Sequence, residues 1–131
     1  MQKIDSSSYM GALAESQFTI FALEQGWEVA YPFLKTTPYD SLIRRSPEVP
    51  WETVQIKRAY YATNGTRKKK CLEVGLRRNR DIKNRRAYRD GDFDWLFCYH
   101  EEGRWFFPWD MIRGRRSCIQ IGSPRYDLWK V

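Results

Sequence analysis

The sequence contains a single histidine and three cysteines, and this scarcity restricts the chemistry that it can carry. His100 alone gives little support for a histidine-based nucleophile relay, and the pair Cys98-x-His100 supplies too few ligands for zinc. Cys71, Cys98 and Cys118 are odd in number and fall near apolar or aromatic residues. This pattern favours reduced packing residues of an intracellular protein over a disulfide framework.

Long apolar runs are also absent. No stretch approaches the roughly 18 apolar residues that a membrane-spanning helix needs. The start, MQKIDSSSYM, lacks the charged-then-apolar order of a signal peptide. We therefore expect a soluble protein with no membrane-spanning segment that is cytoplasmic or sits on DNA, and the sequence shows neither a repeat nor a low-complexity segment.

The sequence is rich in apolar residues and in positively charged residues. With 42% hydrophobic and 16% aromatic residues, 131 residues are enough for one domain with a buried core. Lys and Arg number 23 against 16 Asp and Glu, which gives a net charge of +7. Such an excess favours a polyanionic partner, either nucleic acid or an acidic membrane surface, and charge alone does not choose between them.

Apolar spacing predicts one helix followed by strands. In YMGALAESQFTIFALEQG the apolar side chains recur at helical spacing, a preceding serine can act as the N-cap, and Gly26 can end the helix. WEVAYPF, SLIRR and WETVQIKRAYY are expected to be strands. DWLFCYH and RWFFPWDMI, joined by Glu101, Glu102 and Gly103, predict an antiparallel hairpin. Pro108 is typical of an edge strand. The fold class is therefore α+β or mixed α/β.

Residues 67–89 form a basic stretch, with eleven Lys or Arg side chains opposed only by Glu73 and Asp81. CLEVGL within it is a candidate strand after the turn signal Asn64-Gly65, and a short helix is expected to follow. We expect a domain core at about residues 8–58 and 90–112, a basic DNA-binding insertion at about 59–89, and a C-terminal tail at 113–131. Phosphate contacts from cations supply most non-specific DNA affinity. The predicted DNA contacts are Arg58, Tyr60, Arg67, Lys68, Lys69, Lys70, Arg77, Arg78, Arg80, Lys83, Arg85 and Arg86. The alternative is a solvated charged face.

Four polar residues stand out as candidates for a site. In VQIK, Val54 and Ile56 point to one face of a strand, so Gln55 and Lys57 share the other face. Glu15 lies on the apolar side of the predicted helix, and Asp40 opens a strand after TTPY. Across one sheet these side chains would converge. Taken separately, Gln55 and Lys57 could face solvent, Glu15 could be a helix-surface charge and Asp40 could stabilise a turn.

Two carboxylates beside a strand edge form a site for a hard cation such as Mg²⁺, or Mn²⁺ in its place. Magnesium prefers oxygen ligands, keeps several waters and takes one or two protein carboxylates. Asp40 would bind directly, the Ile56 carbonyl and the Gln55 amide oxygen would add ligands, and Glu15 would bind directly or through water. Lys57 would position or polarise an attacking water, or offset charge on a phosphorane-like transition state.

Together these motifs resemble the PD-(D/E)-XK nuclease superfamily. GALAE resembles the helical glutamate motif, PYD the acidic residue that opens the second strand, and QIK the (D/E)-x-K element. The pair DFDWLFCYH and WFFPW is similar to the strands that close the core. The resemblance is strongest to group I intron-encoded homing endonucleases and covers most of residues 9–110. Gln55 stands where most of the superfamily has Asp or Glu.

The resemblance implies a restriction-endonuclease-like core and a Mg²⁺-dependent endonuclease that hydrolyses phosphodiester bonds of double-stranded DNA. Glu15, Asp40, Gln55 and Lys57 would be the catalytic residues. Because one domain offers one active site, cutting both strands requires at least a homodimer or homotetramer. The alternatives are a Holliday-junction resolvase or restriction-type nuclease on the same scaffold, and a catalytically inactive DNA-binding protein, which the neutral Gln55 would fit.

Overall fold

The chain folds around a central mixed β-sheet, covered by one long helix on one face and by a smaller sheet on the other. A computed structural model describes residues 6–62, 71–78, 86–115 and 117–131. In chain order the elements are α1 (Ser6–Glu24), β1 (Glu28–Ala30), β2 (Ser41–Arg44), β3 (Glu52–Arg58), β4 (Tyr60–Ala62), β5 (Cys71–Gly75), β6 (Arg77–Arg78), β7 (Arg86–Ala87), β8 (Trp95–His100), β9 (Gly103–Pro108), α2 (Trp109–Ile112), β10 (Cys118–Ile119) and the 3-10 helix η2 (Pro124–Trp129).

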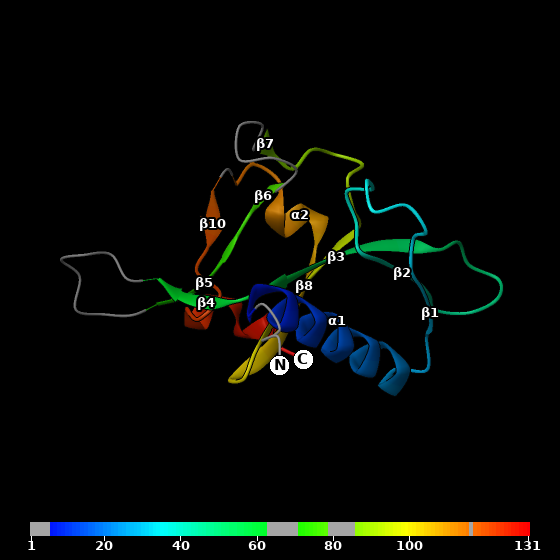
Figure 1. The fold of residues 1–131 in the computed structure, drawn as a ribbon, viewed down its shortest axis with the longest axis horizontal. Helices are drawn as coiled ribbons and strands as arrows, with labels where there is room; N and C mark the ends of the chain where they lie inside the picture. Colours follow the sequence, from blue (N-terminus) through cyan, green and yellow to red (C-terminus); the bar gives the residue numbers. More distant parts are fainter. Residues whose placement is uncertain (1–5, 63–70, 79–85, 116) are drawn as a thin grey trace, which may run out of the picture.

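The central sheet has the strand order β1-β2-β3-β8-β9, in which β3 and β8 are parallel and the other neighbours are antiparallel. Between β3 and β8 the chain leaves this sheet to form the smaller sheet β10-β5-β4 and the pair β6-β7. Figure 1 shows α1 lying along the central strands, with β5 and β10 grouped away from β1 and β2. The predicted mixed α+β class with a central mixed sheet is confirmed.

Helix α1 is held on the central sheet by aromatic packing. Its buried side chains are Ala14, Phe18, Phe21 and Ala22. The Phe18 ring meets the Phe97 ring of β8 edge-on, with ring centroids 5.2 Å apart. After the helix, Gly26 has a φ of +79°, a left-handed conformation that a residue with a Cβ adopts only at a cost. The predicted helix and its glycine stop are therefore confirmed.

The second face of the central sheet is covered by residues from the insertion and the C-terminal segment. Leu72 and Val74 of β5 pack with Leu96 and Phe107 of the central sheet. The predicted tail also contributes buried side chains, namely Ile119, Ile121 and Tyr126. These three side chains of the C-terminal segment are thus part of the core. Strand β10 of this segment pairs with β5, which is more than forty residues earlier in the chain. The sequence around β10 therefore does not predict the pairing.

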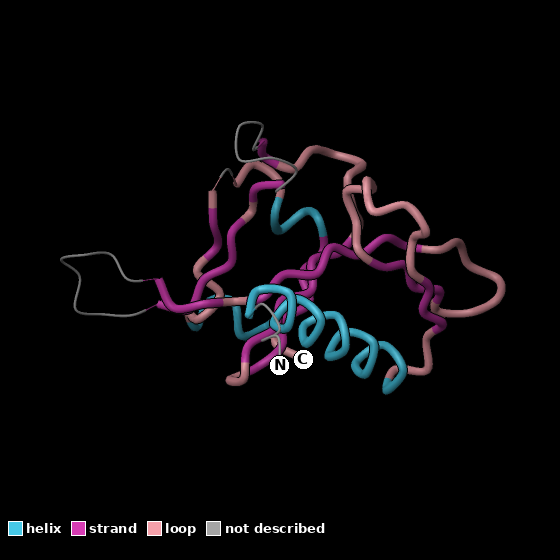
Figure 2. The backbone as a smooth tube through the Cα atoms, in the orientation of Figure 1, coloured by secondary structure: helices cyan, strands magenta, loops and turns pink. Residues whose placement is uncertain are grey.

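The predicted strand WETVQIKRAYY is two strands, because the chain turns from the central sheet at Ala59 and continues as β4 against β5. Figure 2 shows the loop between β2 and β3 at the end of the molecule opposite β4. The short helix expected late in the basic stretch falls largely on residues 79–85, outside the described residues. None of the helices in the described part of the chain is long and apolar enough to cross a membrane.

Candidate active site

The candidate site forms where β2 begins, because Asp40 extends β2 by one residue along β3. The Asp40 N–H donates to the Val54 carbonyl at 2.8 Å. Pairing of β2 with β3 runs only from Glu52 to Val54. Ile56 lies beyond it, and its N–H instead donates to Asp40 Oδ2 at 2.9 Å. The carboxylate is therefore fixed by the sheet itself, in the place that a longer β2 would occupy.

Gln55, which is only 8% exposed, also forms a hydrogen bond to the Asp40 carboxylate. Its Nε2 donates to Asp40 Oδ2 at 2.6 Å and lies 3.3 Å from the Ile56 carbonyl oxygen. The amide nitrogen, which is a donor, thus faces the oxygens of the site. In this arrangement Gln55 orients Asp40 and contacts the Ile56 carbonyl, and its own amide oxygen is not the atom that faces Asp40.

Glu15 and Asp40 share one cavity, of about 420 Å³, although they are 25 residues apart in sequence. Glu15 comes from the middle of α1, and the rest of the wall comes from the loop 31–39 that precedes Asp40. The other lining residues are Tyr31, Pro32, Leu34, Lys35, Thr37 and Tyr39. Helix α1 packs against β3, β8 and β1, and Glu15 of its central turn lines the cavity.

The pKa values of both acids of the site are raised, mainly by burial. Burial raises the pKa of Glu15, the negative charge of Asp40 raises it further, and Lys35 opposes this rise. Burial also raises the pKa of Asp40, against the hydrogen bond from the Ile56 N–H and the charge of Lys57. Repulsion between two acids in one partly buried cavity is relieved by a cation placed between them.

Lys57 follows Ile56 on β3 and brings an amine toward the same acid. Burial lowers the pKa of Lys57, and the Asp40 carboxylate opposes that shift. The Nζ atom lies 5.7 Å from the centre of the Tyr88 ring. Lys57 does not line the cavity that Glu15 and Asp40 share, so its charge is coupled to the site through Asp40. A partly desolvated amine beside a carboxylate can hold or transfer a proton at Nζ.

The donor set of the site suits a hard cation better than zinc. Among the described residues no group of three or more His, Cys, Asp or Glu side chains could hold a metal ion. Magnesium needs only one or two protein carboxylates, with carbonyl oxygens and waters completing six ligands. Asp40, Glu15 and the Ile56 carbonyl provide that set, and the repulsion between the two acids is the property that a cation would offset. The residues present therefore fit Mg²⁺ or Mn²⁺.

The predicted DNA contacts are only partly within the described residues. Tyr60 is 46% exposed. Arg58 is half-buried and lies 3.7 Å from Glu101, while Arg86 is held by Asp92 at 3.0 Å. Arg77 and Arg78 form β6, opposite β7. The remaining predicted contacts lie outside the described residues: Arg67, Lys68, Lys69, Lys70, Arg80, Lys83 and Arg85.

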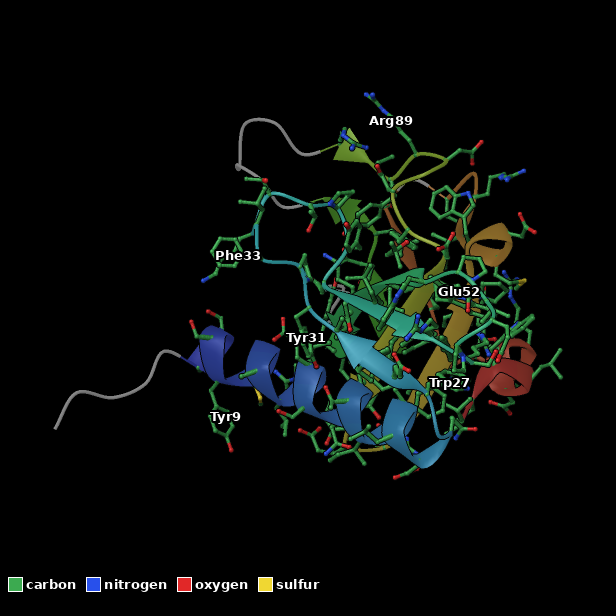
Figure 3. The ribbon with its side chains drawn as sticks, turned by 90° about the vertical axis from the view of Figure 1, so that its right-hand side faces the viewer. Tyr9, Trp27, Tyr31, Phe33, Glu52 and Arg89 are labelled. Atoms are coloured by element: carbon green, nitrogen blue, oxygen red, sulfur yellow. The ribbon has the colours of Figure 1, made fainter. Side chains whose placement is uncertain are left out.

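Sequence reasoning missed the loop 31–39 as part of the site. Lys35 lines the cavity and is the cation whose charge lowers the pKa of Glu15. Phe33 is 98% exposed and Leu34 is 64% exposed, and Figure 3 shows Phe33 projecting outward from this loop. The run YPFLK carried a usable signal, because three large apolar residues beside a proline in a connecting loop have no partner strand or helix to pack on.

Comparison with known proteins identifies one similar phage protein and one similar solved structure among its matches. No family model matches the sequence. The chain is 28% identical over 110 residues to Protein 5.3 of Escherichia phage T7, covering 83% of this chain and 86% of that protein. Its structure superposes on the bacterial homing endonuclease I-Ssp6803I with a TM-score of 0.78 and 26% identity, covering 96% of this chain and 89% of the endonuclease. The chain therefore shares the mixed α+β fold of a bacterial homing endonuclease across nearly its whole length.

Proposed function

We propose that this protein is a metal-dependent endonuclease that hydrolyses phosphodiester bonds in double-stranded DNA at specific sites. The observation that carries the proposal is the placement of Asp40. Strand β3 fixes its carboxylate with two hydrogen bonds, Glu15 lines the same cavity, and the charge of Lys57 lowers the pKa of Asp40 against the effect of burial. This is the arrangement expected of a PD-(D/E)-XK site. Its occurrence on the fold of a homing endonuclease supports a homing-type activity.

Asp40, Glu15 and the Ile56 carbonyl would hold the metal ion. A bound Mg²⁺ or Mn²⁺ would supply Lewis-acid stabilisation of phosphate charge and would acidify water, as divalent ions do in other nucleases. The protein supplies the fixed carboxylate. Because Oδ2 of Asp40 already accepts from the Ile56 N–H and from Gln55 Nε2, its orientation is set before any ligand arrives, and preorganised groups need little rearrangement during the reaction.

Lys57 would act on the attacking water or on the phosphate. Its Nζ is a donor whose pKa is lowered by burial, so it can position a water molecule or donate to a developing negative charge. Asp40, which opposes the lowering of that pKa, keeps the amine charged more of the time. The basic residues of 58–89, together with Tyr60, would bind the DNA backbone on either side of the scissile bond.

The test is Mg²⁺-dependent cleavage of DNA that contains the target site, with Lys57→Met as the variant because Met preserves the apolar stem. Lys130→Met is the matched control, since its amine lies over an aromatic ring, Trp105, away from the site. We expect nicking and linearisation by the wild type, none in EDTA, and a loss of at least about a hundredfold only in Lys57→Met.

Three other outcomes would replace the proposal. If wild-type protein binds DNA with no Mg²⁺-dependent cleavage of any substrate, it is a binding protein, as the neutral Gln55 would allow. If a four-way junction is cut in preference to every linear duplex, it is a junction resolvase on the same fold. If cutting occurs without a homing-type target, the restriction-type alternative holds.

A further inference from the structure

Helix α1 is apolar on two opposite faces, and the sheet covers only one of them. Ala14, Phe18, Phe21 and Ala22 are buried against the central sheet. On the opposite face Tyr9 is 57% exposed, Ile20 is 47% exposed and Leu23 is 61% exposed. Figure 3 shows Tyr9 projecting from α1 away from the rest of the molecule. A helix that is apolar on both faces is typically buried on both.

The outer residues follow the spacing of a helix-pairing seam. Positions 9, 13, 16, 20 and 23 are separated by four, three, four and three residues, which keeps their side chains along one stripe. The stripe reads Tyr9, Leu13, Ser16, Ile20 and Leu23, with a small residue at its centre. A helix surface that faces only water gains nothing from this periodicity.

Charge excludes several classes of partner for this stripe. The 19 residues of α1 contain no Lys or Arg, although the chain has 23 of them. DNA and anionic membranes both require cations at the contact. The acidic residues of α1 are Glu15, which lines the cavity, and Glu24, whose carboxylate lies 3.4 Å from Arg104. The stripe therefore fits an uncharged protein surface.

We propose that the outer stripe of α1 is the contact between two copies of this chain, paired antiparallel about a two-fold axis beside Ser16. In that arrangement Tyr9 lies opposite Leu23 of the second copy, and Leu13 lies opposite Ile20. Two serines meet at the axis, where their small side chains let the helix backbones approach. A stripe that complements itself under rotation is what a two-fold contact between identical chains requires.

The pairing would explain how the proposed endonuclease cuts both DNA strands, and this role of the dimer rests on the proposed function. Glu15 precedes Ser16 and points about 100° away from it around the helix, so pairing leaves the candidate site uncovered. The axis would then lie next to both Glu15 residues, with one candidate site on each side. Two sites related by a two-fold axis can cut the two antiparallel strands of a near-palindromic DNA target.

The first test measures assembly without DNA or metal, so that its result is independent of any nuclease activity. Sedimentation of the wild-type chain in EDTA should give at least twice its mass of 15.8 kDa. Ile20→Glu combined with Leu23→Glu should lower that mass twofold, because two charges would be buried in each copy. Leu128→Glu, at a residue that is 82% exposed on η2, is the matched control and should leave the mass unchanged.

A wild-type chain that stays monomeric at about 100 µM, or a double variant that keeps the wild-type mass, would overturn the proposal. If the double variant does not fold, Ser16→Cys decides the question. Oxidation should link two copies of this variant through the introduced thiols in high yield, whereas Glu48→Cys, in the exposed loop between β2 and β3, should give only background. Absence of the link in folded Ser16→Cys protein would equally refute the contact.

A second measurement tests whether the helix contact is needed for cutting both DNA strands. With the assembly lost and the site intact, the double variant should still nick plasmid DNA while its rate of linearisation falls at least tenfold. Loss of both activities in a folded double variant would mean that the stripe does something other than pair two sites. If the wild type forms the dimer and cuts nothing, the interface stands and the proposed function fails.

Discussion

Replacing Asp40 by Asn tests whether its carboxylate serves the reaction rather than the fold. The substitution keeps the shape of the side chain and removes its charge. The amide oxygen of Asn, in the position of Oδ2, can still accept from both the Ile56 N–H and Gln55 Nε2, so no rotation of the Gln55 amide is needed. Both hydrogen bonds of Asp40 Oδ2 can therefore be replaced, at 2.9 Å and 2.6 Å in the wild type.

The expected change in stability is small. Hydrogen bonds to a charged group contribute about 1.5–3 kcal/mol and those between neutral groups about 0.5–1.5 kcal/mol, so the two bonds lose about 2 kcal/mol together. Against this, burial raises the pKa of Asp40, which means that the ionised form is disfavoured in the folded state and that its removal recovers part of the loss. A net loss near 1 kcal/mol lowers Tm by about 3–5 °C for a chain of this size.

Activity should respond far more strongly than stability. Loss of a direct metal ligand should slow Mg²⁺-dependent DNA cleavage at least about a hundredfold, or about 2.7 kcal/mol of barrier. Asp94→Asn is the control, because Asp94 Oδ2 also accepts from a β3 backbone N–H, that of Thr53 at 2.8 Å, and does not line the cavity. It should lower Tm and leave cleavage unchanged. Equal cleavage by Asp40→Asn and wild type would refute the role given to Asp40.

Further predictions follow from the charges of the site. Gln55→Glu puts an acceptor where a donor lies 2.6 Å from Asp40 Oδ2, so melting in EDTA should show a loss of about 1–3 kcal/mol that Mg²⁺ reverses; no rescue by Mg²⁺ would contradict a cation site. Lys57→Met removes a buried charge whose pKa is lowered, so its Tm should equal or exceed that of wild type; a clearly lower Tm would mean that the amine stabilises the fold. The pKa of folded Asp40 is raised above 3.8, so the folded state takes up this proton first, and stability relative to Asp40→Asn should increase as pH falls from that raised pKa toward 3.8. If chemical denaturation of the two proteins shows that this relative stability falls as pH falls over the same range, then burial is not the main influence on the pKa of Asp40.

The parts of this fold that depend on local periodicity are predictable from the sequence. The spacing of Ala14, Phe18 and Phe21 gives the helix, and Gly26 gives its end. The hairpin of β8 and β9 follows from two apolar runs joined by three residues that favour a turn. Each of these signals lies within about twenty residues of chain, where the pattern of burial repeats with the period of the element.

The remaining parts depend on pairing between distant segments. β10 is only two residues long and is a strand because it pairs with β5. The apolar residues around it are too few and too irregular to predict this. The break of the long predicted strand at Ala59 has the same cause, since β3 stays beside β8 while β4 leaves for β5.

The candidate site also has features that local periodicity predicts and features that it does not. Gln55 and Lys57 could be placed on one face of a strand from alternation alone, and Asp40 at the beginning of another. That the amide of Gln55 presents its nitrogen to Asp40 depends on the acceptor oxygens around it, those of Asp40 and Ile56. That Lys35 lines the cavity with Glu15 depends on the conformation of the loop 31–39. Loop conformation has no periodicity, so the sequence cannot reveal these contacts.

The claim that Glu15 and Asp40 act at a single site is tested most directly by comparing cleavage rates of Glu15→Gln, Asp40→Asn and the double variant under saturating Mg²⁺. Residues that act as a unit give losses that are not additive. We predict that the double variant cleaves DNA no more than about threefold more slowly than the slower single variant. Losses that multiply, or a single variant with wild-type activity, would show that the two acids do not work together.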